Sequence, residues 1–102
     1  MPIFKIKGQV IDITPPHTYN KKNDVKMIVD INVPSFMTEK RMECIPFDFM
    51  GANMGMLSTV KVGDYVEIDF ELRGRKWIKP DTNEAVRHYN NEAMDIKVID
   101  ND

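Results

Sequence analysis

Residues 65–72 read YVEIDFEL, a stretch in which apolar and acidic side chains alternate without a break. Successive side chains of a β-strand point to opposite faces of the sheet, so this pattern predicts a half-buried strand. Its even-numbered residues, Val66 to Leu72, would face a core. The three acidic residues between them would form a solvated outer face. The same period of two recurs through most of the chain, and strands are therefore expected to dominate the fold.

Three further strands are predicted before this stretch, and the first two lie within residues 3–33. Residues 3–13 form the first, and the adjacent apolar pair at 10–11 shifts its alternation, which indicates a β-bulge. The Pro-Pro pair at 15–16 ends this strand, because neither proline can donate a hydrogen bond to a neighbouring strand. Residues 25–33 form the second strand, with every odd-numbered residue apolar and expected to face the core.

A third strand and a short helix are predicted next. Residues 40–49 form the strand, but Pro46 interrupts it and leaves its inward face ambiguous. Residues 51–59 contain Met54 and Leu57 at helical spacing, and we interpret them as a short helix that closes a barrel. A methionine-rich surface for an adaptable partner is the alternative.

The last strand is expected at about residues 88–99, with Met94, Ile96 and Val98 facing inward, after a long hairpin loop over residues 74–87. Five strands with a short helix between the third and fourth follow the order of the OB-fold, a partly open Greek-key β-barrel. The sequence therefore predicts an all-β, five-stranded OB-fold that spans residues 1–102 as a single domain.

The segment at residues 73–79, RGRKWIK, concentrates positive charge in a chain whose net charge is −2. It holds four cations, no acid and Trp77, the only tryptophan of the chain. An indole among cations suits single-stranded nucleic acid, whose bases can stack and whose phosphates need neutralising. Trp77 could instead cover the barrel end or a subunit contact, and the cations could be a solvated hairpin. The predicted contacts in this segment are Arg73, Arg75, Lys76, Trp77 and Lys79.

A second basic segment lies in the predicted turn between the first and second strands. OB-folds usually bind oligonucleotides on their second and third strands and on the loops that join strands 1–2 and 4–5. The two basic segments fall on those two loops. Polar turns are commonly rich in lysine, so a merely solvated turn is the competing interpretation. The candidate residues outside the hairpin are Tyr19, Lys21, Lys22 and Lys26, together with Arg41 at the start of the third strand.

Residues 60–97 contain Val62-Gly63-Asp64, Val66 and Ile68, Leu72-Arg73, Arg75-Lys76-Trp77, Tyr89 and Glu92. With these residues the stretch resembles the matching part of the bacterial single-stranded DNA-binding protein family, and small OB-fold proteins of bacteria and their phages resemble the chain throughout. In that family the tryptophan and its basic neighbours lie on a hairpin that contacts DNA. The resemblance thus implies this role for Arg73, Arg75 and Trp77.

Several classes of function are not supported by the sequence. One cysteine and two histidines give no spacing for a zinc site, and no acidic pair with a histidine indicates a metal nuclease. We find no Ser/His or Cys/His constellation, no phosphate-binding glycine loop and no dinucleotide motif. No catalytic residue, metal or cofactor is therefore expected. The N-terminus lacks the apolar run of a signal peptide, and no membrane-spanning stretch is present, so a cytoplasmic location is expected.

The sequence thus predicts a protein that binds single-stranded DNA with little sequence preference and protects it during replication or recombination. Self-association into a dimer or tetramer is expected, because joining small binding grooves raises affinity. Single-stranded RNA stays open as a ligand, since nothing in the sequence selects for or against a 2′-hydroxyl. The alternative function is an OB-fold protein-interaction module of a replication or phage assembly complex.

Overall fold

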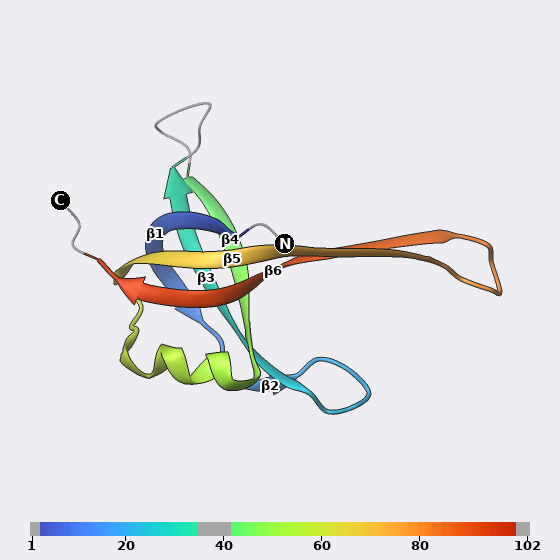
Figure 1. Ribbon diagram of the computed structural model, residues 1–102, viewed down its shortest axis with the longest axis horizontal. Coiled ribbons are helices and arrows are strands. Elements are labelled where there is room, and N and C mark those ends of the chain that lie inside the picture. The colour runs from blue at the N-terminus through green and yellow to red at the C-terminus, as the bar shows by residue number, and fades with distance from the viewer. Residues whose placement is uncertain (1–2, 35–41, 100–102) are drawn as a thin grey trace.

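The computed structural model describes residues 3–34 and 42–99, which form a closed β-barrel with a projecting hairpin (Figure 1). The strands pair in the order β1-β5-β6-β4-β3-β2, and a further β1–β3 pairing closes the barrel. The two-residue β2 is only a short addition to β3. The prediction of a five-stranded OB-fold with one helix between its third and fourth strands is confirmed. The elements are β1 (Phe4–Ile13), β2 (His17–Thr18), β3 (Val25–Pro34), β4 (Met42–Met50), the 3₁₀ helix η1 (Gly51–Thr59), β5 (Tyr65–Ile78) and β6 (Ala85–Val98).

The first strand curves strongly, because it pairs with β5 over its first half and with β3 over its second half. Its register with β3 shifts between Val10 and Asp12, so the predicted bulge is confirmed. Gly8 lies where the strand turns from one partner to the other. A Cβ atom at Gly8 would lie 2.4 Å from the backbone oxygen of Asn32. A glycine is therefore needed here to let the two backbones approach.

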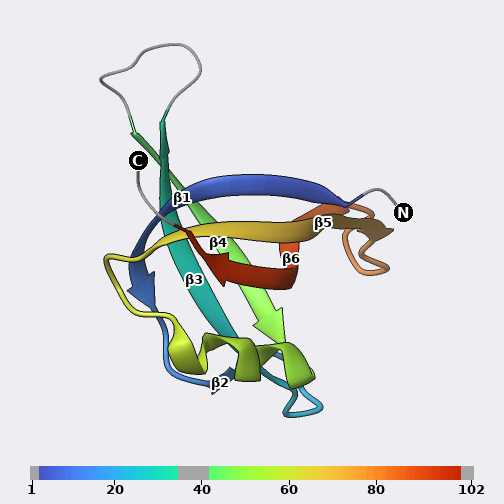
Figure 2. The same ribbon diagram turned by 60° about the vertical axis from the view of Figure 1, so that its left-hand side comes forward.

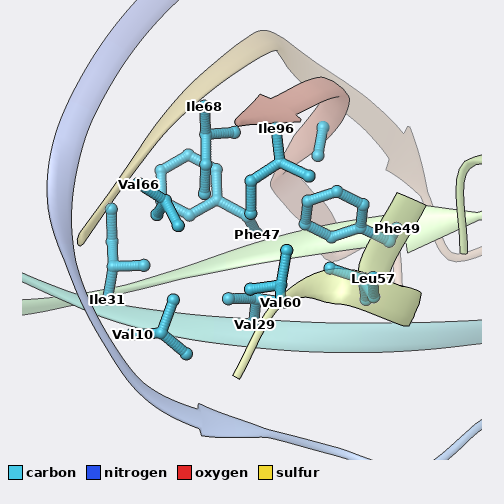
Figure 3. Close-up of a cluster of buried hydrophobic side chains, with 11 residues drawn as sticks. Val10, Val29, Ile31, Phe47, Phe49, Leu57, Val60, Val66, Ile68 and Ile96 are labelled. Atoms are coloured by element: carbon cyan, nitrogen blue, oxygen red, sulfur yellow. The ribbon is translucent and has the colours of Figure 1, made fainter. Parts of the chain in front are cut away.

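The core fills the barrel with side chains from every long strand and from η1 (Figure 3). Phe47 and Phe49 of β4 are fully buried, which resolves the ambiguous facing of that strand. Leu57 of η1 is buried beneath them, and Met54 and Met56 pack against the same cluster. The helix thus closes one end of the barrel, as Figure 2 shows. The buried apolar residues are Val10, Val29, Ile31, Phe47, Phe49, Leu57, Val60, Val66, Ile68, Ala93 and Ile96.

The expected facing of the last strand is wrong in part. Asp69 pairs with Asp95 but Phe70 pairs with Ala93, so β6 carries an extra residue at Met94. This bulge moves Ala93 into the core and leaves Met94 half-buried. Val98, expected to face inward, is exposed.

The hairpin differs from the sequence expectation in its length. Residues 74–78 and 85–87 were expected in a loop but belong to β5 and β6, which stay paired as far as Ile78 and Ala85. The loop itself covers only residues 79–84. There the backbone N–H of Lys79 donates to the Glu84 carbonyl, and Asn83 adopts a φ of 57°. Leu72, expected to face the core, is exposed because β5 has already left the barrel at that point.

The acidic outer face of β5 is covered by lysines of its two neighbouring strands. Lys5 of β1 donates to Asp69 at 3.1 Å, and Lys97 of β6 lies 3.3 Å from Glu67. The hydrogen bond to Asp69 raises the pKa of Lys5. These pairs are surface contacts on the outer face of the barrel, formed by β1, β5 and β6. Within the described ranges, no helix is long and apolar enough to cross a membrane.

Candidate nucleic-acid interface

A cavity of about 500 Å³ lies at the base of the β5–β6 hairpin, between this hairpin and the β2–β3 loop. Both segments project from the same end of the barrel in Figure 1. The end of β4 forms the floor between them. The lining residues are Tyr19, Asn20, Lys26, Asp48, Met50, Arg73, Gly74, Arg75, His88 and Asn90. The cavity therefore joins the two loop regions that the sequence assigned to binding.

The β2–β3 loop is organised by the side chain of Asn20. Its Oδ1 accepts hydrogen bonds from the backbone N–H groups of Lys22 and Asp24, at 3.0 and 3.1 Å. Its Nδ2 donates to the Asp24 carboxylate at 2.8 Å. Asn23 follows with a φ of 62°, a conformation that asparagine tolerates better than most residues. This turn chemistry fixes the loop and leaves Lys21 and Lys22 exposed.

Tyr19 forms the wall of the cavity on the loop side. Its hydroxyl donates to the sulfur of Met50 at 3.6 Å, and the Lys26 ammonium lies 5.1 Å from the centre of its ring. The side chain still has 41% of its surface exposed. An aromatic ring held at both its tip and its face, yet open to solvent, is suited to stacking with a planar ligand.

The floor of the cavity carries a buried carboxylate that the sequence interpretation did not include among its candidate residues. Asp48 is only 7% exposed, and its Oδ2 accepts from Lys26 at 3.3 Å and from the Asn90 amide at 3.0 Å. Strand parity could have revealed it. Asp48 lies between Phe47 and Phe49, so once these two face the core, the carboxylate must point outward from β4.

One face of the hairpin continues the cavity outward. Arg73, Arg75 and Trp77 alternate along β5 and share this face with Asn90, His88 and Val86, their cross-strand partners. The guanidinium carbon of Arg75 lies 5.1 Å from the centre of the Trp77 ring. Trp77 is 41% exposed, so the ring is held by the arginine but not enclosed.

Arg73 differs from Arg75 because two carboxylates already neutralise it. Its Nε donates to Glu92 at 2.8 Å, and its Nη2 lies 3.2 Å from Oε2 of Glu71. Glu71 and Glu92 face each other across the β5–β6 ladder. Arg73 therefore lines the cavity with much of its positive charge compensated.

The remaining predicted residues do not gather at the cavity. Lys76 lies on the opposite face of the hairpin, where it pairs across the ladder with Arg87. Lys79 begins the hairpin loop and is exposed. Arg41 lies outside the described residues. The structure thus places Tyr19, Lys26, Arg73 and Arg75 around the cavity, with Trp77 further out on the same hairpin face. Lys21 and Lys22 are exposed in the β2–β3 loop, next in the chain to the lining residue Asn20.

The arrangement combines cations, two aromatic rings and a polar floor, which suits reversible binding of a charged planar ligand. Within residues 3–34 and 42–99, no group of three or more His, Cys, Asp or Glu side chains could hold a metal ion. Asp48 and Asn90, the polar groups at the floor, are already hydrogen-bonded to each other.

Comparison with known proteins places the chain in a family. Residues 5–96 match the family model described as Domain of unknown function (DUF3127). The chain belongs to this family. No curated protein sequence matches this DUF3127 chain.

Solved structures share the fold of this DUF3127 chain over nearly its whole length. The mitochondrial single-stranded DNA-binding protein Rim1 of S. cerevisiae has a TM-score of 0.66 at 12% identity, covering 99% of this chain and 97% of its own. The Plasmodium falciparum SSB in complex with ssDNA has a TM-score of 0.64 at 13% identity, with 98% and 96% covered. The dimeric N-terminal domain of PriB from Thermoanaerobacter tencongensis has a TM-score of 0.57 at 19% identity, with 97% of each chain covered. These likenesses support the OB-fold, which single-stranded DNA-binding proteins share.

Proposed function

We propose that this protein binds single-stranded DNA in the groove between the β2–β3 loop and the β5–β6 hairpin. The observation that carries the proposal is the continuity of the cavity with the hairpin face that bears Arg75 and Trp77. A nucleotide strand leaving the cavity would pass over this face. Phosphates and stacked bases would supply most of the affinity, with little preference for sequence.

Most of the predicted contacts have a place in this proposal, but Lys76 on the opposite face of the hairpin does not. Lys21, Lys22 and Lys79 are exposed on the two loops and would neutralise phosphates on either side of the groove. Tyr19 would stack on a base at the cavity and Trp77 on a base further along the hairpin. Arg75 already covers one face of the Trp77 ring, so a base would use the other face or displace the guanidinium.

The comparisons agree with the proposal at the level of the fold. One similar structure is described as a complex with ssDNA, and another is described as a mitochondrial single-stranded DNA-binding protein. The usual OB-fold binding surface includes the two loops that flank the cavity of this chain. Protection of single strands in replication or recombination is the role that such binding would serve.

The proposal includes self-association into a dimer or tetramer. The reverse face of the hairpin, which points away from the cavity, exposes Leu72, Ile78 and Tyr89, and Tyr89 is 79% exposed. Leu72 and Tyr89 lie close together on this face, and the Lys76–Arg87 pair separates them from Ile78. Exposed apolar side chains of this kind are typical of protein contacts. Joining two or more grooves would raise affinity for a long strand. Sedimentation of the free protein measures this directly.

A fluorescence titration tests DNA binding at the proposed site. Trp77 is the only tryptophan, so quenching of its emission by oligo-dT at low salt reports on the hairpin itself. We expect quenching that saturates. Trp77→Ala should weaken binding, measured with a labelled oligonucleotide, by roughly 1–3 kcal/mol, and Trp77→Phe by less because a smaller ring can still stack. Saturable binding that leaves Trp77 emission unchanged would place the DNA elsewhere.

A protein-interaction module is the second candidate function. The observation that favours it is the mixed charge of the groove, where Asp48 compensates Lys26 and two glutamates compensate Arg73. Gel shifts with single-stranded DNA, duplex DNA and single-stranded RNA of equal length separate the candidates. Binding to none of them at low salt would favour the interaction module, and equal binding of RNA and DNA would widen the ligand to single strands of either kind.

A further inference from the structure

A groove that only neutralised phosphates would gain nothing from a carboxylate at its floor. Asp48 lies there nevertheless, almost fully buried and reachable from the cavity. Burying a charged group is costly unless partners compensate it, and here Lys26 and Asn90 do so. The position is thus built to keep a negative acceptor in the cavity, and it calls for a ligand that can donate hydrogen bonds.

The two contacts of Asp48 leave further acceptor capacity at the floor. Both use Oδ2, at 3.3 and 3.0 Å, whereas an ionised carboxylate offers about four lone-pair positions on its two oxygens. An ionised carboxylate can only accept, so Asn90 must present its NH₂ group to Asp48. The amide oxygen of Asn90 then remains as a second acceptor beside the first.

We propose that the cavity receives one nucleobase and that Asp48 makes it favour a base bearing an amino group over thymine or uracil. This inference rests on the proposed function and adds a modest base preference at one position to otherwise unselective binding. A volume of about 500 Å³ falls within the ordinary size of small-molecule sites, so a base fits between the Tyr19 wall and the hairpin. The chemical class of the favoured ligand is cytosine, adenine or guanine in a single strand.

The preference follows from the edges of the bases. Cytosine presents its N4 amino group as a donor, and aspartate accepting from that group is an established form of base readout. The N3 atom of cytosine, next to this amino group, can accept a hydrogen bond from Lys26, whose ammonium lies beside the Asp48 carboxylate. Uracil and thymine present one N–H between two carbonyl oxygens. Because a carbonyl oxygen flanks this N–H on each side, a hydrogen bond from the N–H to Asp48 would also bring a carbonyl oxygen close to the negative carboxylate. The two oxygens would repel each other.

Equal-length oligo-dC and oligo-dU provide the sharpest test, because the two bases have the same ring and neither carries a methyl group. Affinities are measured by anisotropy at pH 8 and fixed salt. We expect the unmodified protein to bind oligo-dC about fivefold or more tightly than oligo-dU. In Asp48→Asn the ratio should fall to within about twofold, because an amide both donates and accepts. Freeing Lys26 in this variant strengthens phosphate contacts with both oligonucleotides alike, so the ratio isolates the effect of the base.

Asp30→Asn is the matched control, since Asp30 faces outward from the adjacent strand β3 but does not line the cavity. It should keep the ratio of the unmodified protein. Asp48→Ser gives the same test with a smaller side chain if the asparagine variant does not fold. Equal affinities for the two oligonucleotides in the unmodified protein, or a preference that survives in Asp48→Asn, would overturn the inference and leave DNA binding intact. Failure to bind either oligonucleotide would overturn the proposed function and this inference with it.

Discussion

The Nε of Arg73 lies 2.8 Å from Oε2 of Glu92, and this contact divides the basic hairpin into two parts. Glu71 approaches the same guanidinium at 3.2 Å, so the inner arginine is held between two carboxylates from paired strands. Arg75, two residues further out, lies over Trp77 instead. The positive charge available to a ligand is therefore weaker at the base of the hairpin than farther along it.

Releasing Arg73 should strengthen DNA binding. Glu92→Gln removes one negative charge from the edge of the groove, while the amide oxygen can still accept from Nε. We expect the affinity for oligo-dT to rise about two- to threefold at low salt, a gain of roughly half a kcal/mol. Glu67→Gln is the control of equal charge, because Glu67 pairs with lysines on the outer face of the barrel. If Glu92→Gln and Glu67→Gln raise the affinity for oligo-dT equally, the gain comes from the change in net charge and not from the release of Arg73 in the groove.

The salt dependence of binding should identify the lysines that contact phosphates. For single strands, log affinity falls with log salt at a slope of about −0.7 per neutralised phosphate. Lys22→Gln in the β2–β3 loop should make the slope shallower by about 0.7. Lys7→Gln, on the outer face near Glu67, should leave it unchanged. A slope that responds to Lys7 but not to Lys22 would move the DNA to the other side of the barrel.

The strands of the barrel could be predicted from sequence because each has one buried face. The alternation at residues 25–33 and 65–71 is imposed by burial, and the structure places Val29, Ile31, Val66 and Ile68 in the core. The bulge near Val10 was also visible, since two adjacent apolar residues cannot both face inward on a regular strand. The order of the strands also predicted where the two basic segments lie, with Lys21 and Lys22 in the loop before β3 and residues 73–79 in the β5–β6 hairpin.

The hairpin and the floor of the cavity could not be predicted in the same way. Both faces of the ribbon beyond Leu72 are exposed, so burial imposes no alternation there, and backbone pairing continues without a sequence signal. The bulge at Met94 depends on how β6 aligns with β5. Likewise, the contacts of Asp48 with Lys26 and Asn90 join three strands, and only the closed barrel brings them together.

Gly8 should be more important for stability than Gly55, an exposed glycine of η1. A Cβ at this position would meet the Asn32 carbonyl oxygen at 2.4 Å, and that oxygen belongs to backbone that cannot swing away. We expect Gly8→Ala to lower the free energy of unfolding by about 1–3 kcal/mol, as other overpacked sites do. Gly55→Ala in η1 is the control, because a Cβ added at Gly55 would have nothing within 4 Å. Urea denaturation of the two variants measures the difference, and equal stabilities would show that β1 can shift away from β3.

Asp30 should make the fold more stable as the pH falls toward the ordinary aspartate range. Burial raises the pKa of Asp30, and the negative charge of Asp12, its partner across the β1–β3 ladder, raises it further. The folded state therefore binds this proton more readily than the unfolded chain, whose aspartate titrates near 3.8. In the window between these two pKa values, stability declines as the pH rises, and the penalty is complete above the folded pKa.

Asp30→Asn removes that penalty, so the variant should be more stable than the unmodified protein at pH 7 by roughly half a kcal/mol, the order expected for like charges placed opposite each other in a sheet. The advantage should shrink as the pH falls through the folded pKa and vanish well below pH 3.8, where the carboxyl is protonated in both states. Thermal unfolding across the pH range measures this, and Asp12→Asn should reproduce part of the gain by removing the second charge. An advantage that persists undiminished at low pH would mean that the introduced amide gains a contact of its own, and the charge argument would then be wrong.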